Sequence, residues 1–213
     1  MRRSIIATLF LLIVSGFLHI EAQEIKELPE PKKRGGMRLM KALNQRQSSR
    51  EFVDKQMRDQ MLSNLLWAAF GINRPESGKR TAPSSHNVQD IQIYLTTSEG
   101  AFLYLPEKNA LKEIVSEDVR SKTGKQDFVA NASVNLVYVS DFSAYSEGSK
   151  QQHMVTAGTH CGFIGQNVYL FCASEDLNVV FRGWIDKKLI KKTLNLKEDQ
   201  HVMYSQSVGF PKP

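Results

Sequence analysis

Cysteine is scarce in this chain, and the scarcity excludes several kinds of site. Of the 213 residues only Cys161 and Cys172 are cysteines, and neither belongs to a C-x-x-C pair, which removes the usual dithiol and zinc-site patterns. They stand eleven apart in one predicted helix, where a rise of about 1.5 Å per residue separates their Cα atoms by roughly 16 Å, too far for a disulfide. We therefore interpret both as helix-packing residues.

The signatures of other enzyme classes are missing as well. The sequence contains no G-x-S-x-G, no P-loop and no H-E-x-x-H, which are the short motifs of common hydrolases, nucleotide-binding proteins and metalloproteases. Its five histidines are scattered. His153 and His160 lie two turns apart on one predicted helix, but a metal there would need further ligands that are not evident. We expect no metal site.

Strong charge is also lacking. The formal net charge is +6, an excess that is spread along the chain and too weak to predict nucleic-acid binding, although it suits an anionic cofactor. No repeats or low-complexity segments occur.

The first 22 residues have the organisation of an export signal. Arg2 and Arg3 precede an apolar run over residues 5–18, and Ala22 offers a small residue at a cleavage site. The run is shorter than the roughly 20 residues of a spanning helix, so a retained membrane anchor is the less favoured alternative. We expect a periplasmic or secreted protein with no stable membrane span after cleavage.

The remaining chain predicts a leader and one domain. Residues 23–36 are charged, contain proline and show no periodicity, which indicates a mobile leader. Residues 37–213 are long enough for one domain with a sizeable core. Their order of helices and strands predicts an α+β fold whose chain ends in its sheet.

Periodicity and turn residues locate the individual elements. We expect helices over 37–46, 54–71, 151–175 and 187–196, a β-hairpin over 91–106, and strands over 133–141, 178–186 and 201–210. Residues 73–89 predict a long loop, and residues 109–129 a helical or irregular stretch.

A short segment near the start of the domain collects hydrogen-bond donors. Residues 44–52 read "NQRQSSREF" and contain Arg46, Ser48 and Arg50. Guanidinium groups and serine hydroxyls both donate to phosphate oxygens, so this segment is a candidate anion cradle. The alternative is a solvated surface turn.

Three stretches together resemble the FMN-dependent nitroreductase family. They are "RQSSREF", the loop "APSSHNVQ" at residues 82–89, and the run "GFIGQNVYLFCASEDLNVVFRGWID" with the closing "SVGFPK". The resemblance spans roughly residues 37–213, and its weight comes from the order and spacing of the stretches. It implies a central antiparallel or mixed sheet flanked by helices, in an intertwined homodimer that binds two FMN molecules at its interface. The short single-domain form looks closest to the azoline-oxidising, dehydrogenase-like branch.

The resemblance also implies roles for the donor segment. Arg46 and Ser48 would bind the FMN phosphate and ribityl chain, Arg50 would lie beside N1 and the C2 carbonyl of the flavin, and Gln47 would be an adjacent donor. A cation near N1 stabilises the negative charge of a reduced flavin. Two solvated arginines at a helix end are the alternative interpretation.

A second group of residues is expected around the flavin ring. The resemblance implies that four residues of one subunit approach the flavin bound to the other: Pro83, Ser84, Ser85 and Asn87. The alternative is an ordinary turn. Gly183 would place its backbone N–H against flavin N5, because a residue without Cβ permits close approach. Gln126 would contact the pyrimidine edge.

Two departures from the family pattern affect the expected phosphate and substrate contacts. Arg182 stands where typical nitroreductases carry Glu, so its side chain would meet substrate or phosphate, or else form a surface salt bridge. The chain ends soon after its last strand, which leaves Lys212 to complete the phosphate site unless Lys79 or Arg80 substitutes.

The function implied is an FMN-dependent oxidoreductase. It would transfer two electrons, as hydride through flavin N5, between a donor and a small organic substrate, with no side chain assigned as general acid or base. The donor would be NAD(P)H or, for an exported protein, a periplasmic electron donor, and the apolar helix over 158–173 would form the dimer core. The alternative is a non-catalytic flavin- or ligand-binding module with the same fold.

Overall fold

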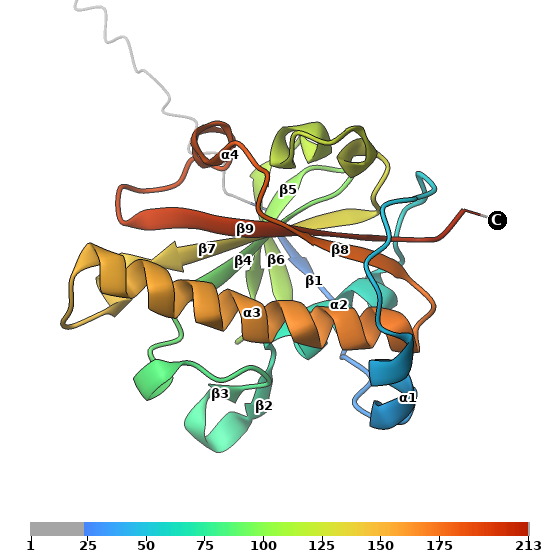
Figure 1. Ribbon diagram of the computed structural model, residues 1–213, viewed down its shortest axis with the longest axis horizontal. Coiled ribbons are helices and arrows are strands. Elements are labelled where there is room, and N and C mark those ends of the chain that lie inside the picture. Colours follow the sequence, from blue (N-terminus) through green and yellow to red (C-terminus); the bar gives the residue numbers. More distant parts are fainter. Residues whose placement is uncertain (1–23, 213) are drawn as a thin grey trace, which may run out of the picture.

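A seven-stranded sheet is the centre of the computed structural model, which describes residues 24–212 (Figure 1). The predicted export signal lies outside these residues. The strand order is β1-β6-β5-β4-β7-β9-β8, and every neighbouring pair is antiparallel. The strands are β1 (Ile25–Glu27), β4 (Ile91–Thr96), β5 (Ala101–Leu105), β6 (Ala110–Val115), β7 (Val134–Asp141), β8 (Asn178–Arg182) and β9 (Gln200–Gly209).

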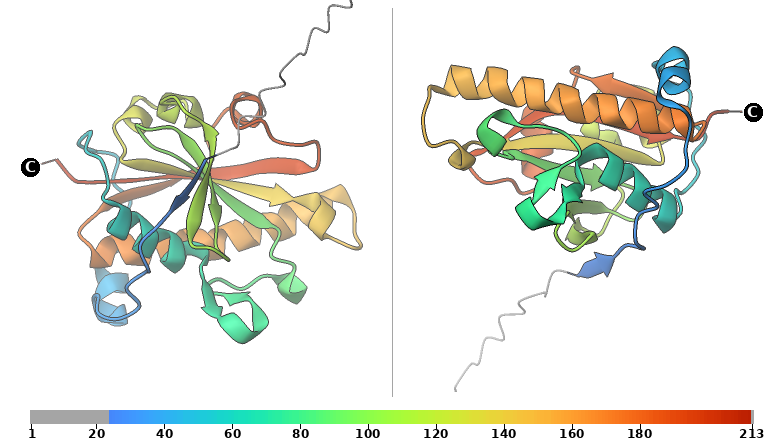
Figure 2. Two further views of the ribbon diagram at one scale, coloured as in Figure 1. Left: turned by 180° about the vertical axis from the view of Figure 1, so that it is seen from behind. Right: turned by 90° about the horizontal axis from the view of Figure 1, so that it is seen from below.

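Helices cover both faces of this sheet. On one face lie α2 (Asp59–Phe70) and the long α3 (Lys150–Ser174), with α1 (Leu39–Gln45) against the C-terminal end of α3 (Figures 1 and 2). On the other face lie α4 (Lys187–Thr193) and two short 3-10 helices, η3 (Arg120–Thr123) and η4 (Asp127–Ala130). The predicted α+β architecture with a helix-flanked antiparallel sheet is therefore confirmed.

The strand β7 shows why the sheet needs both coverings. Leu136 and Tyr138 pack into the core under α2 and α3, while Val137 and Val139 pack into a second core with Ile190 of α4. A strand that is buried on both faces reads as a nearly continuous apolar run. This accounts for the predicted buried strand over 133–141.

Two segments differ from their predictions. Residues 25–27, expected in a mobile leader, form β1 and pair with β6, and Leu28 and Pro31 behind them are buried. Residues 110–115, expected to be helical or irregular, form β6. β1 is the edge strand and β6 is its neighbour, and half-exposed polar side chains such as Lys112 obscure the alternation of a strand.

The predicted loop over 73–89 is partly ordered by backbone hydrogen bonds. It contains a two-stranded hairpin, β2 (Ile72–Arg74) with β3 (Lys79–Arg80), and two 3-10 turns, η1 (Pro75–Ser77) and η2 (Ser85–Asn87). The expected hairpin around Glu99-Gly100 is present as β4 and β5.

The two cysteines lie where packing was predicted. Cys161 and Cys172 are both buried on the sheet-facing side of α3, and burial raises the pKa of each thiol far above its usual range. They are inert parts of the core. None of the helices within residues 24–212 is both long and apolar enough to span a bilayer.

Candidate functional site

The donor segment 44–52 runs along the outer edge of β8. It leaves α1 at Arg46, whose backbone N–H donates to the Ala42 carbonyl, and it then bonds to β8 through Ser49 N–H and the Val179 carbonyl at 2.9 Å. The Asn178 side chain donates to the Glu51 carbonyl at 2.6 Å. These bonds hold the segment in one place while Arg46 and Arg50 project from it.

Tyr169 of α3 contacts this segment at two points. Its hydroxyl lies 2.7 Å from Ser48 Oγ, and the Arg46 guanidinium lies over its ring, 5.2 Å from the ring centroid. The same hydroxyl accepts a hydrogen bond from the Phe181 backbone N–H of β8 at 2.9 Å. Neither Arg46 nor Arg50 forms an ion pair with a carboxylate within residues 24–212.

The side chains of the donor segment lie on two different sides of it. Gln47 and Ser49 line a cavity of about 530 Å³ whose wall also carries Asp176, whereas Arg46, Ser48 and Arg50 do not line it. Tyr169 lines the same cavity and also contacts Ser48 and Arg46. Gln47 therefore lies on a different side of the segment from the three donors but near the same tyrosine.

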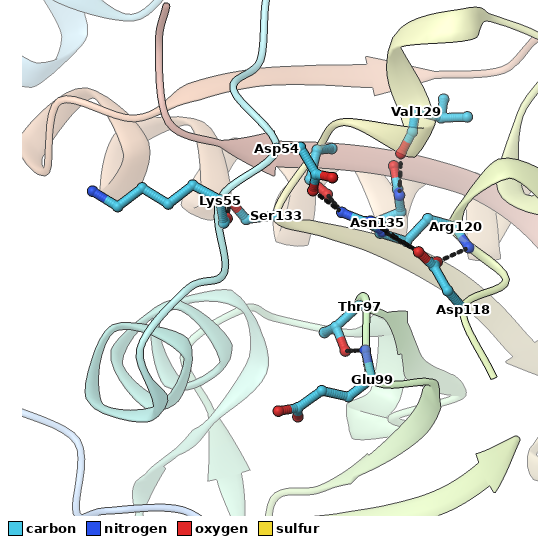
Figure 3. A network of polar contacts seen from close by, with 10 residues as sticks. Asp54, Lys55, Thr97, Glu99, Asp118, Arg120, Val129, Ser133 and Asn135 are labelled. Atoms are coloured by element: carbon cyan, nitrogen blue, oxygen red, sulfur yellow. Dashed lines mark hydrogen bonds and ion pairs between the residues drawn. The ribbon is translucent and has the colours of Figure 1, made fainter. Parts of the chain in front are cut away.

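Beyond Phe52 the chain is anchored by a buried arginine. Arg120 donates to Asp54 at 2.8 Å and to Asp118 at 2.8 Å, and Ser133 donates to the Lys55 carbonyl at 2.6 Å (Figure 3). These contacts tie residues 52–55 to the start of β7. The donor segment is thus held between α1 and this network.

The serine-rich loop is a second predicted contact region, and it is held in a strained conformation. His86, Asn87 and Gln89 have φ angles of 49°, 56° and 49°, a left-handed region that non-glycine residues adopt at some cost and that clusters at functional sites. Ser84 Oγ accepts from the Gln89 backbone N–H at 3.0 Å. Ser85 and Asn87 are exposed.

A buried histidine and aspartate hold this loop from the interior. The Ser85 backbone N–H donates to His160 Nε2 at 2.8 Å, so His160 carries its proton on Nδ1, which donates to Asp90 at 2.5 Å. Ser140 Oγ donates to the other oxygen of Asp90. Burial alone would raise the pKa of the Asp90 carboxyl, but the hydrogen bonds from His160 and Ser140 outweigh burial and lower that pKa.

Within one protomer the two predicted regions lie at different positions along α3. Tyr169 holds the donor segment and His160 holds the serine loop, nine residues earlier on the same helix. Nine residues of α-helix correspond to roughly 13 Å. Figure 1 shows α1 at the C-terminal end of α3 and the turn that follows β3 beside its N-terminal half.

Gly183 follows β8 and is exposed. A Cβ there would meet only the Tyr204 ring, at 3.6 Å, so the protein itself leaves room for a side chain. Trp184 beside it is 66% exposed. A glycine whose space is not filled by its own chain is available for close approach by a ligand.

Arg182 does not point toward this open site. Its guanidinium is buried on the opposite face of the sheet and donates to the Thr123 carbonyl, Asn135 Oδ1, Ser205 Oγ and Gln126 Oε1 at 3.0, 3.1, 2.8 and 3.4 Å. Burial without a carboxylate partner lowers the pKa of Arg182 to about 10. The expectations of a substrate, phosphate or surface contact are corrected, because strand alternation places Phe181 toward α3 and Arg182 away from it.

The remaining predicted residues are dispersed. Gln126 is half-buried against Arg182, and Lys212 is exposed at the end of the described chain. Arg80 forms an ion pair with Glu107 at 2.9 Å and donates a hydrogen bond to Gln89 at 2.7 Å. Lys79 is exposed.

Sequence reasoning did not identify Tyr169, His160 or Asp90 as parts of the site. Tyr169 and His160 lie in an apolar helix, where both look like packing residues. The sequence offered one signal, a histidine within an apolar helix together with an acidic residue where a polar loop meets a strand. Because buried ionisable groups are paired, a contact between these two residues could have been predicted.

The structure defines an α+β class with an antiparallel sheet covered by helices on both faces, and comparison with known proteins supplies the family. The nitroreductase family model matches residues 43–210. The chain therefore belongs to the nitroreductase family.

Individual relatives agree with this assignment. A curated relative from Methanocaldococcus jannaschii, named as a nitroreductase, is 29% identical over 177 residues, covering 76% of this chain and 86% of the relative. A crystal structure from Ralstonia eutropha JMP134, also described as a nitroreductase, has a TM-score of 0.84 and 36% identity, and the match covers 89% of this chain and 90% of that one.

A more distant structure shows the same fold with a bound flavin. A nitroreductase from Desulfovibrio desulfuricans in complex with FMN has a TM-score of 0.57 and 19% identity, over 84% of this chain and 89% of that chain. Membership of this family identifies the protein as an oxidoreductase.

Proposed function

We propose that this protein is an FMN-dependent oxidoreductase that transfers two electrons between a donor and a small organic molecule. The observation that carries the proposal is the donor segment. Arg46 and Arg50 have no carboxylate partner within the described chain, and Ser48 stands between them with its hydroxyl bonded to Tyr169. Two cations and a hydroxyl on one short segment suit a dianionic phosphate.

The open glycine supports a flat ligand beside this segment. Gly183 directly follows β8, and both Ser49 and Tyr169 form hydrogen bonds to this strand. The same strand therefore positions the phosphate donors and the glycine. Bound FMN supplies the two-electron chemistry. The protein would hold the phosphate through Arg46 and Ser48, place the charge of Arg50 near the pyrimidine, and offer the Gly183 backbone N–H to the central ring.

A homodimer would complete this site. The exposed face of α3 carries Val155 and Phe163, which are 68% and 44% exposed, with Gly158 and Gly162 between them. A Cβ at either glycine would meet nothing in the described chain, so these glycines are not needed for packing within the protomer. Close approach by a second copy is a use for them, and it fits the predicted dimer core over residues 158–173.

The position of the serine loop is compatible with a site shared between two copies. It is held at His160, roughly 13 Å along α3 from the Tyr169 contact. Ser85 and Asn87 therefore serve the site of the other protomer in this proposal. Exposed Leu39 and Met40 of α1 extend the apolar surface at the end of α3.

The electron donor and the location are part of the proposal. The signal-like residues 1–22 favour export, and NAD(P)H is scarce outside the cytoplasm. We therefore favour a substrate dehydrogenase of azoline-oxidising type, or reduction by a periplasmic donor, over an NAD(P)H-driven reaction. Rapid NADPH oxidation by protein recovered from the cytoplasm would contradict this part.

The experiment is to purify the full chain and record its visible spectrum together with its mass by sedimentation equilibrium. We expect a yellow protein of twice the protomer mass that releases FMN on denaturation. Arg46→Ala and Arg50→Ala should each lower flavin occupancy, while Lys188→Ala on α4 should not. A colourless monomer that does not take up added FMN would refute the proposal.

Turnover separates an enzyme from a binding module. The bound flavin is bleached with dithionite under argon, and quinones, nitroarenes and azoline compounds are then added in turn. Return of the oxidised spectrum faster than with buffer alone supports the enzyme. Return no faster than with buffer alone, for every acceptor, supports the non-catalytic alternative.

A further inference from the structure

We propose that Tyr169 is a positioning residue for the phosphate end of the site, through its ring under Arg46 and its hydroxyl on Ser48. Both donors would then be presented together to one phosphate. The inference rests on the proposed function, since it concerns the anion that the donor segment binds.

The direction of the hydrogen bonds carries the first step. The Phe181 backbone N–H can only donate, so it occupies a lone pair of the Tyr169 oxygen at 2.9 Å. Among residues 24–212 the Tyr169 proton has no acceptor other than Ser48 Oγ, at 2.7 Å, so we assign Tyr169 as the donor in this pair. In this arrangement the proton of Ser48 is directed away from Tyr169, and no other side-chain hydrogen bond of Ser48 occurs among residues 24–212.

The result is a chain of donors that all point toward the exposed side of the segment. It begins at the half-buried backbone amide of Phe181, passes through the phenol and ends at an exposed serine hydroxyl. Consecutive hydrogen bonds polarise one another. Ser48 is therefore a better donor to an anion than a freely rotating serine.

The ring of Tyr169 carries the second step. Arg46 lies over this ring at 5.2 Å from the centroid and is half-buried. An aromatic face holds a cation without neutralising its charge, whereas a carboxylate partner would compete with the phosphate. Arg46 is thus oriented and still fully available to an anion.

The position of Tyr169 is set by close packing between α3 and β8. A Cβ on Gly165, one turn earlier on α3, would lie 2.7 Å from the Phe181 ring, so the missing side chain lets the helix approach the strand. This approach brings the phenol within reach of the Phe181 backbone. Tyr169 thereby joins the donor segment to the strand that leads to Gly183.

The test compares the affinity for FMN with that for riboflavin, which lacks the phosphate, in the apo form of the full chain. Tyr169→Phe keeps the ring and removes the hydroxyl, and we expect FMN binding to weaken about fivefold to tenfold while riboflavin binding stays within twofold. Tyr169→Leu removes both supports and should weaken FMN binding further, about 30-fold or more. Tyr94→Phe is the matched control, because it removes a tyrosine hydroxyl that accepts from Gln200 on the far face of the sheet.

A double-mutant comparison distinguishes an action through Ser48 from a general loss of order. If Tyr169 acts by orienting Ser48, then Tyr169→Phe should change the ratio of FMN to riboflavin affinity little in a Ser48→Ala background. Ser48 is exposed, so Ser48→Ala should fold even if a Tyr169 variant does not, and by itself it should lower that ratio.

Two outcomes would overturn the inference while leaving the proposed function intact. They are an unchanged ratio of FMN to riboflavin affinity in Tyr169→Phe, whether both affinities are kept or both fall equally, and an unchanged ratio in Ser48→Ala. A wild-type protein that binds neither FMN nor riboflavin would instead refute the proposed function itself.

Discussion

Replacing Gly183 by alanine should separate the stability of the fold from the binding of flavin. A Cβ at Gly183 would lie 3.6 Å from the Tyr204 ring, an ordinary van der Waals contact, and the backbone is not in the left-handed region. The substitution also reduces the freedom of the unfolded chain. We therefore expect the free energy of unfolding to stay the same or to rise by up to about 1 kcal/mol.

Flavin binding should respond in the opposite direction. If the ring approaches the Gly183 N–H, the added methyl group crowds that approach, and overpacking of this kind costs about 1–3 kcal/mol. The dissociation constant for FMN should then rise about fivefold to 150-fold. Gly183→Val should weaken binding at least as much.

The assay is titration of apo protein with FMN, followed by flavin fluorescence, alongside urea unfolding of the same samples. Gly165→Ala is the contrasting variant, because its Cβ would lie 2.7 Å from the Phe181 ring, and it should lose about 1–3 kcal/mol of stability. Unchanged FMN affinity in both Gly183→Ala and Gly183→Val would refute the placement of the ligand. A large loss of stability in Gly183→Ala would refute the geometry.

The remaining predictions concern the buried polar groups and the exposed helix face. The pKa of Asp90 is lowered in the folded state, so its contribution to stability is present above about pH 4 and is lost as pH falls further. In Asp90→Asn the free energy of unfolding should therefore depend less on pH in this acid range, and an unchanged dependence would contradict this. Arg182→Ala removes four side-chain hydrogen bonds and should cost about 3 kcal/mol in urea unfolding, whereas wild-type stability would show that the guanidinium is not a core element. Gly162→Glu on the open face of α3 should give a monomer in sedimentation velocity, unlike Leu189→Glu on α4; a dimeric Gly162→Glu protein would place the interface elsewhere.

Local patterns were sufficient for the elements that are buried on regular faces. The continuous apolar run of β7 could be predicted because both faces of this strand are buried. The long helix α3 could be predicted because apolar residues lie on the face that packs on the sheet and also on its outer face, where Val155 and Phe163 are exposed. The three residues of β1 could not, because nothing in their sequence favours a strand and their order depends on pairing with β6, more than 80 residues later. Edge strands are specified by tertiary contacts more than by propensity.

The site divides in the same way. Arg46, Ser48 and Arg50 could be predicted because their chemistry is local to one segment. The contacts of Tyr169 with Ser48 and of His160 with Ser85 join residues 121 and 75 positions apart, which single-sequence patterns do not report. The buried direction of Arg182 could also have been predicted. Side chains alternate along a strand, so Phe181 and Arg182 of β8 lie on opposite faces of the sheet.

The separation of the two regions along α3 has a thermodynamic consequence. If each flavin site takes Arg46 from one protomer and Ser85 from the other, then FMN binds only the paired state. A ligand that binds only one state stabilises that state by mass action. FMN must therefore promote association, and association must raise the apparent affinity for FMN by the same factor, because the coupling between two equilibria is reciprocal. A site built within one protomer would show neither dependence, so titration with FMN at several protein concentrations distinguishes the two arrangements without any substitution. An apparent affinity that does not change with protein concentration, in a range where the dimer dissociates, would mean that one chain holds the flavin alone.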